Sequence, residues 1–93
     1  MPWTWDQNKA DANLRKHAVS FELAQRVFDD PFSLTRSDLF RDEARWQTIG
    51  MPFAGSPSVL FVVHSDENDG GGRIITARRA TTHERRAYEK GEF

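Results

Sequence analysis

Ser58-Val-Leu-Phe-Val-Val-His64 and Arg73-Ile-Ile-Thr-Ala-Arg-Arg-Ala80 are the two stretches that decide the fold of this chain. Both are rich in β-branched residues, and a glycine-rich, acidic segment separates them, which predicts an antiparallel β-hairpin. Apolar residues occur at both parities of each strand, as in strands that are covered on two faces. The hairpin is therefore expected in the middle of a sheet, and a symmetric turn would place His64 opposite Arg73 and Ser58 opposite Arg79.

The N-terminal third of the chain carries the signals of a short strand and two helices. Alternation over Trp3–Trp5 predicts the strand, and Asp6 is placed to cap a helix that ends near His17. Ser20 is placed to cap a second helix over Phe21–Asp29, which Pro31 ends.

The remaining elements complete the predicted fold. Further strands are predicted over Phe32–Thr35 and Arg45–Ile49, joined by a charged turn over Ser37–Glu43, and Gly50–Pro57 is predicted to be a loop. Thr81-Thr-His-Glu84 matches a capping box and opens a last helix that Gly91 would end. The prediction is an α+β fold: a small antiparallel meander with two N-terminal helices and a C-terminal helix.

Length and composition bound the class of protein. Ninety-three residues suffice for one domain, predicted over residues 1–93, and the net charge of -1 excludes a protein that coats nucleic acid by bulk charge. There is no cysteine, which fits a reducing compartment. The N-terminus lacks the pattern of a secretory signal and the longest apolar run, Val59–Val63, is too short to span a bilayer. We therefore expect a soluble, cytoplasmic protein with no membrane partner.

A local basic cluster contrasts with this near-neutral total. Five arginines lie between Arg73 and Arg86. Guanidinium groups pair bidentately with phosphate, and the start of the last helix would add its backbone amides, so the cluster predicts a phosphodiester or acidic-partner site. The alternative interpretation is a solvated strand end and helix face. The end of a largely apolar strand favours function for Arg78 and Arg79, whereas Arg85 and Arg86 fit the solvated face better.

Histidines and carboxylates give weaker signals. Histidine titrates near neutrality, so His64 is a candidate general acid or base, although a histidine at the end of a buried strand is more often structural. The three histidines lack the spacing of a zinc site, and Asp29-Asp30 before Pro31 is typical of a helix end rather than a magnesium site. We predict neither a metal site nor a cofactor.

Two separated motifs resemble one protein family. The first is Trp5-Asp6-x-x-Lys9-x-x-x-Asn13-x-x-Lys16-His17-x-Val19-x-Phe21-x-x-Ala24-x-x-Val27-Phe28-Asp29-Asp30-Pro31. The second is Arg73-Ile-Ile-x-Ala-Arg78-Arg79-Ala-Thr-x-x-Glu84-Arg85-x-x-Tyr88. Together they resemble the BrnT toxins of bacterial type II toxin-antitoxin pairs. The resemblance implies a RelE-like fold, a ribonuclease activity that halts translation, and neutralisation by a BrnA antitoxin, through which alone the toxin would meet DNA.

The resemblance and the residues together suggest roles in RNA cleavage. We assign stabilisation of the phosphorane charge to Arg78 and Arg79, which requires their guanidinium groups to face a common cleft rather than to pair with internal carboxylates. His64 is the candidate acid or base, and Tyr88 is a candidate proton donor because RelE-like enzymes often have a tyrosine after the last strand. The remaining candidates are RNA-binding residues: Arg45, Arg73, Arg85 and Arg86.

The general base stays open at this stage. RelE relatives carry a lysine-rich middle strand, and this chain has Arg45-Trp-Gln47 there instead. Two other functions are compatible with the sequence: a non-catalytic basic module that docks an acidic partner, and a toxin of the RelE-like fold that acts on gyrase.

Overall fold

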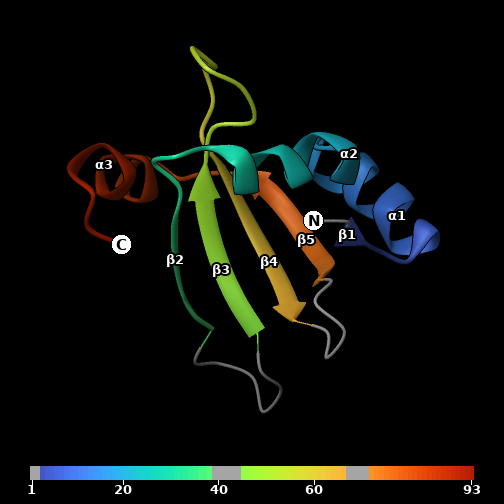
Figure 1. Ribbon diagram of the computed structural model, residues 1–93. Helices are drawn as coiled ribbons and strands as arrows, with labels where there is room; N and C mark the ends of the chain where they lie inside the picture. The colour runs from blue at the N-terminus through green and yellow to red at the C-terminus, as the bar shows by residue number, and fades with distance from the viewer. Residues whose placement is uncertain (1–2, 39–44, 67–71) are drawn as a thin grey trace.

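In the part of the chain that the structure describes, five strands form one sheet in the order β1-β5-β4-β3-β2 (Figure 1). The computed structural model describes residues 3–38, 45–66 and 72–93. The strands are Trp3–Thr4 (β1), Leu34–Ser37 (β2), Arg45–Gly50 (β3), Leu60–Asp66 (β4) and Gly72–Arg79 (β5). Neighbours from β2 to β5 pair antiparallel, but β1 pairs parallel to β5. The predicted α+β class is confirmed, whereas the predicted all-antiparallel sheet is wrong at this edge, and the sheet is mixed.

Helices form where the sequence supplies caps. They are α1 (Gln7–His17), α2 (Phe21–Ala24), the 3-10 helix η1 (Gln25–Asp29) and α3 (Thr82–Lys90). Asp6 accepts hydrogen bonds from the first amides of α1, Ser20 accepts one from the Leu23 amide, and Thr81 and Glu84 form the predicted capping box. Gly91 ends α3 at a φ of 70°, where glycine has no steric penalty. The second predicted helix is α-helical only over its first turn and then tightens to 3-10 geometry.

Two apolar cores lie on opposite faces of the sheet. Side chains alternate between faces along a strand, and on β4 Leu60 and Val62 point to one core while Phe61 points to the other. The first core is covered by α1, α2 and η1, and the second by α3. In Figure 1 α1 (blue) and α3 (red) accordingly lie on opposite sides of the molecule, with the strands between them. No helix in the described ranges is long and apolar enough to cross a membrane.

The central hairpin is displaced from its predicted register. Leu60, not Ser58, is the partner of Arg79, and Ser65, not His64, is the partner of Arg73. A β-bulge at Val63/His64 shifts the pairing part-way along, because β5 contributes one residue more than β4 there. The symmetric register predicted from the sequence is therefore wrong, although both strands are interior to the sheet as expected.

Two features of the N-terminal region satisfy the edge of β5 that does not pair with β4. Asn13 of α1 donates to the Ala77 carbonyl at 2.9 Å and accepts from the Ala77 amide at 3.2 Å, as a neighbouring strand would. Farther along, β1 pairs with the start of β5, and the Trp3 ring lies so close to Gly72 that a Cβ there would be 2.1 Å from it. Gly72 is thus required by close approach.

Candidate nucleic-acid interface

The strand register gathers arginines on the face of the sheet that α3 partly covers. Residues directly opposite each other in neighbouring strands present their side chains on one face. On the face that carries Phe61, Val63 and Ser65 of β4, called the α3 face below, the pairings place three rows across the sheet. The rows, in order away from α3, are Leu34–Ile49–Phe61–Arg78, Arg36–Gln47–Val63–Thr76 and Arg45–Ser65–Arg73.

The first row holds an arginine that is already paired. Both terminal nitrogens of Arg78 donate to the Glu84 carboxylate, at 2.8 and 3.0 Å, and its guanidinium carbon lies 4.0 Å from the centroid of the Phe61 ring. Burial alone would raise the pKa of the Glu84 carboxyl, but hydrogen bonds from Arg78 and Thr81 outweigh it and hold that pKa below its usual value. Arg78 therefore fastens α3 to the sheet, and its charge is offset by a carboxylate.

The last row lines a cationic pocket. Arg45 and Arg73 flank Ser65 in register, and with Lys9 at the start of α1 they border a cavity of about 360 Å³. Asp6, the N-cap of α1, also lies on its wall. Arg73 and Lys9 are exposed and make no ion pair within 4.0 Å among residues 3–38, 45–66 and 72–93. The pocket has the size and charge to hold a phosphate group and part of its sugar.

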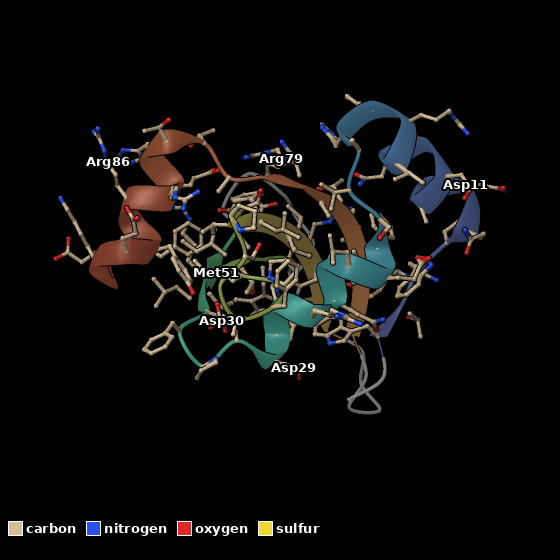
Figure 2. All side chains as sticks on the ribbon, turned by 90° about the horizontal axis from the view of Figure 1, so that it is seen from above. Asp11, Asp29, Asp30, Met51, Arg79 and Arg86 are labelled. Atoms are coloured by element: carbon tan, nitrogen blue, oxygen red, sulfur yellow. The ribbon has the colours of Figure 1, made fainter. Side chains whose placement is uncertain are left out.

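The other arginines of the sequence cluster lie away from this pocket. Arg79 points to the face opposite Arg78, because the two residues are adjacent on β5. Arg85 donates to the Pro57 carbonyl at 2.8 Å and lies 3.8 Å from Glu89. Figure 2 shows Arg79 where β5 leads into α3, and Arg86 pointing outward from α3. The common cleft expected for Arg78 and Arg79 is therefore not formed.

His64 occupies a buried aromatic site on the face opposite the arginine rows. The residue is 5% exposed, and its ring is nearly perpendicular to those of Trp3 and Phe28, with 5.2 and 4.8 Å between centroids. Its Nε2 atom lies 2.7 Å from the Thr48 hydroxyl, which in turn lies 2.7 Å from that of Thr35. These contacts are those of a structural histidine; its predicted role in proton transfer stays a prediction.

Tyr88 belongs to a separate network around Asp30. The Tyr88 hydroxyl donates to Asp30 at 2.6 Å, and the same carboxylate accepts from the amides of Met51 and Phe32. Figure 2 shows Asp30 and Met51 close together. This carboxylate and Tyr88 lie on the wall of a largely apolar cavity of about 440 Å³, which is lined by neither Arg45 nor Arg73.

The network shifts both ionisation equilibria. Burial and the hydrogen bond to Asp30 raise the pKa of Tyr88 to about 12, so the phenol is a weak acid. Burial would raise the pKa of the Asp30 carboxyl, but its three hydrogen bonds outweigh burial and lower that pKa. Asp30 thus ties η1, the segment after β3 and α3 together, which the helix-end interpretation of Asp29-Asp30 did not anticipate.

Two residues of the interface were missed by sequence reasoning. Arg36 sits on the edge strand β2 and Lys9 on α1, both outside the arginine cluster. Alternation along β2 could have placed Arg36 on the same side as Leu34. Only the fold brings Lys9 to Arg45 and Arg73. No group of three or more potential metal-ligating side chains occurs in the part of the chain that the structure describes.

Comparison with known proteins shows the family to which this small α+β domain with its arginine-bearing sheet face belongs. The family model described as "Ribonuclease toxin, BrnT, of type II toxin-antitoxin system" matches residues 5–84. The chain belongs to this family of ribonuclease toxins, which confirms the resemblance drawn from the two motifs and implies an RNA target and an antitoxin partner.

A solved structure shows the same fold. The crystal structure of the Brucella abortus ribonuclease toxin BrnT is similar with a TM-score of 0.64 at 18% sequence identity, and the alignment covers 88% of this chain and 99% of that one. A search of curated protein sequences gave no significant match.

Proposed function

We propose that this protein is a metal-independent, RelE-like endoribonuclease of the cytoplasm that inhibits translation and is neutralised by a BrnA-like antitoxin, through which alone it contacts DNA. Family membership supports the ribonuclease activity. The observation that carries the proposal is the row of Arg45, Ser65 and Arg73, which with Lys9 borders one pocket at the end of the sheet far from α3.

The chemistry asked of these residues is electrostatic. In metal-free cleavage the 2′-oxygen attacks the adjacent phosphorus, its proton leaves, the bond to the 5′-oxygen breaks and that oxygen gains a proton. The phosphorane between these steps carries extra negative charge, which guanidinium groups held beside the phosphate offset. Arg45 and Arg73 stand on two strands with Ser65 between them, so they can hold one phosphate from both sides.

The geometry favours the pocket beside Arg73, which makes no ion pair within the described ranges, over the pair assigned from the sequence. Arg78 is held by Glu84, and Arg79 lies on the other face of the sheet. Their catalytic role stays a prediction, together with those of His64 and Tyr88. Arg79, Arg85 and Arg86 stay candidate RNA contacts at the far end of the sheet. Arg79 lies about 20 Å from Arg73 along β5.

A cleavage assay on a defined single-stranded RNA with EDTA present tests the proposal. The wild-type protein is expected to cleave, and Arg73→Ala to lower the rate by about 10²-fold or more, the usual effect of losing one charge-stabilising donor. Arg15→Ala, which removes an exposed arginine of α1, is the matched control and should cleave as the wild type does. The cleavage rate of Arg79→Ala, set beside that of Arg73→Ala, shows on which end of β5 cleavage depends.

The possible outcomes separate the candidate functions. Loss of cleavage in Arg79→Ala but not in Arg73→Ala would return the site to the far end of the sheet. A wild type that cleaves only after magnesium is added would refute metal independence. A protein that cleaves no RNA yet blocks growth would favour the interaction module or the gyrase inhibitor. Inhibition of cell-free translation tests the proposed effect on translation. Its relief by the co-expressed antitoxin tests the proposed neutralisation.

A further inference from the structure

Arg36 is an exposed arginine of the α3 face whose guanidinium contacts two other side chains. Its Nε donates to the side-chain oxygen of Gln47 at 2.8 Å, and its guanidinium carbon lies 3.9 Å from the centroid of the Phe93 ring. The residue nonetheless stays solvent-exposed on β2. Since Phe93 covers one face of the guanidinium and Gln47 occupies its Nε edge, the exposed parts are the second face and the terminal nitrogens.

Both supports of Arg36 are themselves fixed. Phe93 packs edge-on against Phe61, with 6.5 Å between ring centroids and an interplanar angle of 88°. Gln47 is 9% exposed, and its amide nitrogen lies 3.4 Å from an oxygen of Asp38. The guanidinium plane is therefore oriented before any ligand binds, which removes much of the entropy cost of ordering it.

An oriented guanidinium with one open face is a surface for a nucleobase. Unpaired bases of single-stranded RNA stack on aromatic rings and on arginine planes, and a base laid on Arg36 would extend the stack that Phe93 begins. Arg45 lies on the neighbouring strand one row farther from α3, roughly 8 Å away between backbone positions. One nucleotide can reach from the phosphate pocket to Arg36.

We propose that Arg36 and Phe93 form a nucleobase subsite, which stacks one unpaired base next to the phosphate held by Arg45 and Arg73. The inference rests on the proposed function, because that function makes RNA the ligand. The subsite binds through the planar face of Arg36, so it needs a guanidinium and not merely a positive charge. Gln47 is a positioning residue that sets the angle of that plane.

Abasic RNA provides a direct test. A short single-stranded RNA is prepared with one abasic site at each position in turn, as a 2′-O-methyl form that cannot be cleaved and as an unmodified form. Binding is measured by fluorescence anisotropy and cleavage by gel for the wild type, Arg36→Lys and Phe93→Leu. Arg15→Lys, at an exposed site on α1, is the matched control, and circular dichroism verifies that each variant is folded.

Stacking predicts coupling between one base and the Arg36–Phe93 pair. Removing that base should weaken wild-type binding about tenfold, a typical value for a stacked base. Arg36→Lys and Phe93→Leu should bind the intact RNA several-fold more weakly and should lose little more when the same base is removed. Arg15→Lys should match the wild type at every position.

Four results would count against the inference or its basis, and they differ from one another. Full affinity in Arg36→Lys would make Arg36 a phosphate contact. An abasic penalty that is the same in the wild type and both variants would place the base elsewhere. Wild-type protein that neither binds nor cleaves RNA would refute the proposed function and the subsite together, whereas binding without cleavage would refute only the proposed activity.

Discussion

At the scale of single residues, Asn13 shows how one polar side chain closes the edge of a sheet. Its amide donates to the carbonyls of Val19 and Ala77 and accepts from the Ala77 amide, and the residue is 7% exposed. Buried backbone groups that lose their partners cost about 1 to 3 kcal/mol each. Asn13 therefore holds α1 against β5 through hydrogen bonds as well as apolar contact.

Asn13→Ala should accordingly lower the free energy of unfolding by about 2 to 4 kcal/mol, since it leaves the Ala77 amide and carbonyl unpaired. Urea denaturation measures the loss. Asn8→Ala, at an exposed position of the same helix, is the matched control and should change stability by no more than about 0.5 kcal/mol. Equal losses in the two variants would show that the asparagine bonds contribute nothing specific.

Tyr88 gives a prediction with a defined pH window. Its pKa is about 12 in the folded chain and 10.0 in the reference state, so between these pH values the folded protein keeps a proton that the unfolded chain releases. The free energy of unfolding should therefore fall as pH rises from 10 to 12. Lysines also titrate there, so the quantity to measure is the difference in stability between the wild type and Tyr88→Phe.

That difference should be largest at neutral pH and shrink toward pH 12, because the substitution removes the group that titrates. A difference that stays constant across the window would mean that the hydrogen bond to Asp30 does not stabilise the neutral phenol in solution.

At the scale of elements, the sequence predicts helix starts, which depend on neighbouring residues, but not strand pairing, which depends on distant ones. Asp6, Ser20 and Thr81 each satisfy amides within three residues, so the sequence predicts the starts of the three α-helices. The bulge at Val63/His64 and the parallel pairing of β1 depend on residues far apart in the chain. No local pattern encodes them, and the predicted register failed for that reason.

For the candidate site too, the sequence predicted residue types but not their tertiary contacts. Arginine content pointed to Arg45 and Arg73 as phosphate contacts, but only the observed register places them on either side of Ser65. The reverse holds for Arg78, whose partner Glu84 was predicted correctly as a capping residue yet not as its ion-pair partner. A residue type can be predicted from the sequence, whereas its availability depends on tertiary contacts.

The junction of β1 and β5 supplies a prediction for these elements. Gly72→Ala would bring a Cβ within 2.1 Å of the Trp3 ring, which is itself stacked on Phe28 at 3.8 Å between centroids. Crowding of this kind costs about 1 to 3 kcal/mol, and we expect that loss in urea denaturation. In a Trp3→Ala background the same substitution should cost far less. If the cost is the same in both backgrounds, the backbone of Gly72 and not the ring contact is responsible.

At the scale of the whole molecule, the net charge is small although 29% of the residues are charged, and several arginines share one face of the sheet. The chain has a net charge of -1, yet the α3 face carries four arginines, at positions 36, 45, 73 and 78. The exposed carboxylates of Asp11 and Asp29 lie elsewhere, on α1 and at the end of η1 (Figure 2). Such a distribution steers a polyanion to one face without attracting it to the whole surface.

The salt dependence of RNA binding counts the phosphates held on that face. For single strands, log K falls against log salt concentration with a slope of about −0.7 for each phosphate neutralised. The pocket of Lys9, Arg45 and Arg73 holds one phosphate, so it should contribute about −0.7 to the wild-type slope, measured with uncleavable 2′-O-methyl RNA. Arg73→Ala should make the slope shallower by up to about 0.7, and Arg15→Ala should leave it unchanged. Weaker binding by Arg73→Ala with an unaltered slope would mean that Arg73 contacts RNA elsewhere than at a phosphate, and the electrostatic role assigned to the pocket would then be wrong.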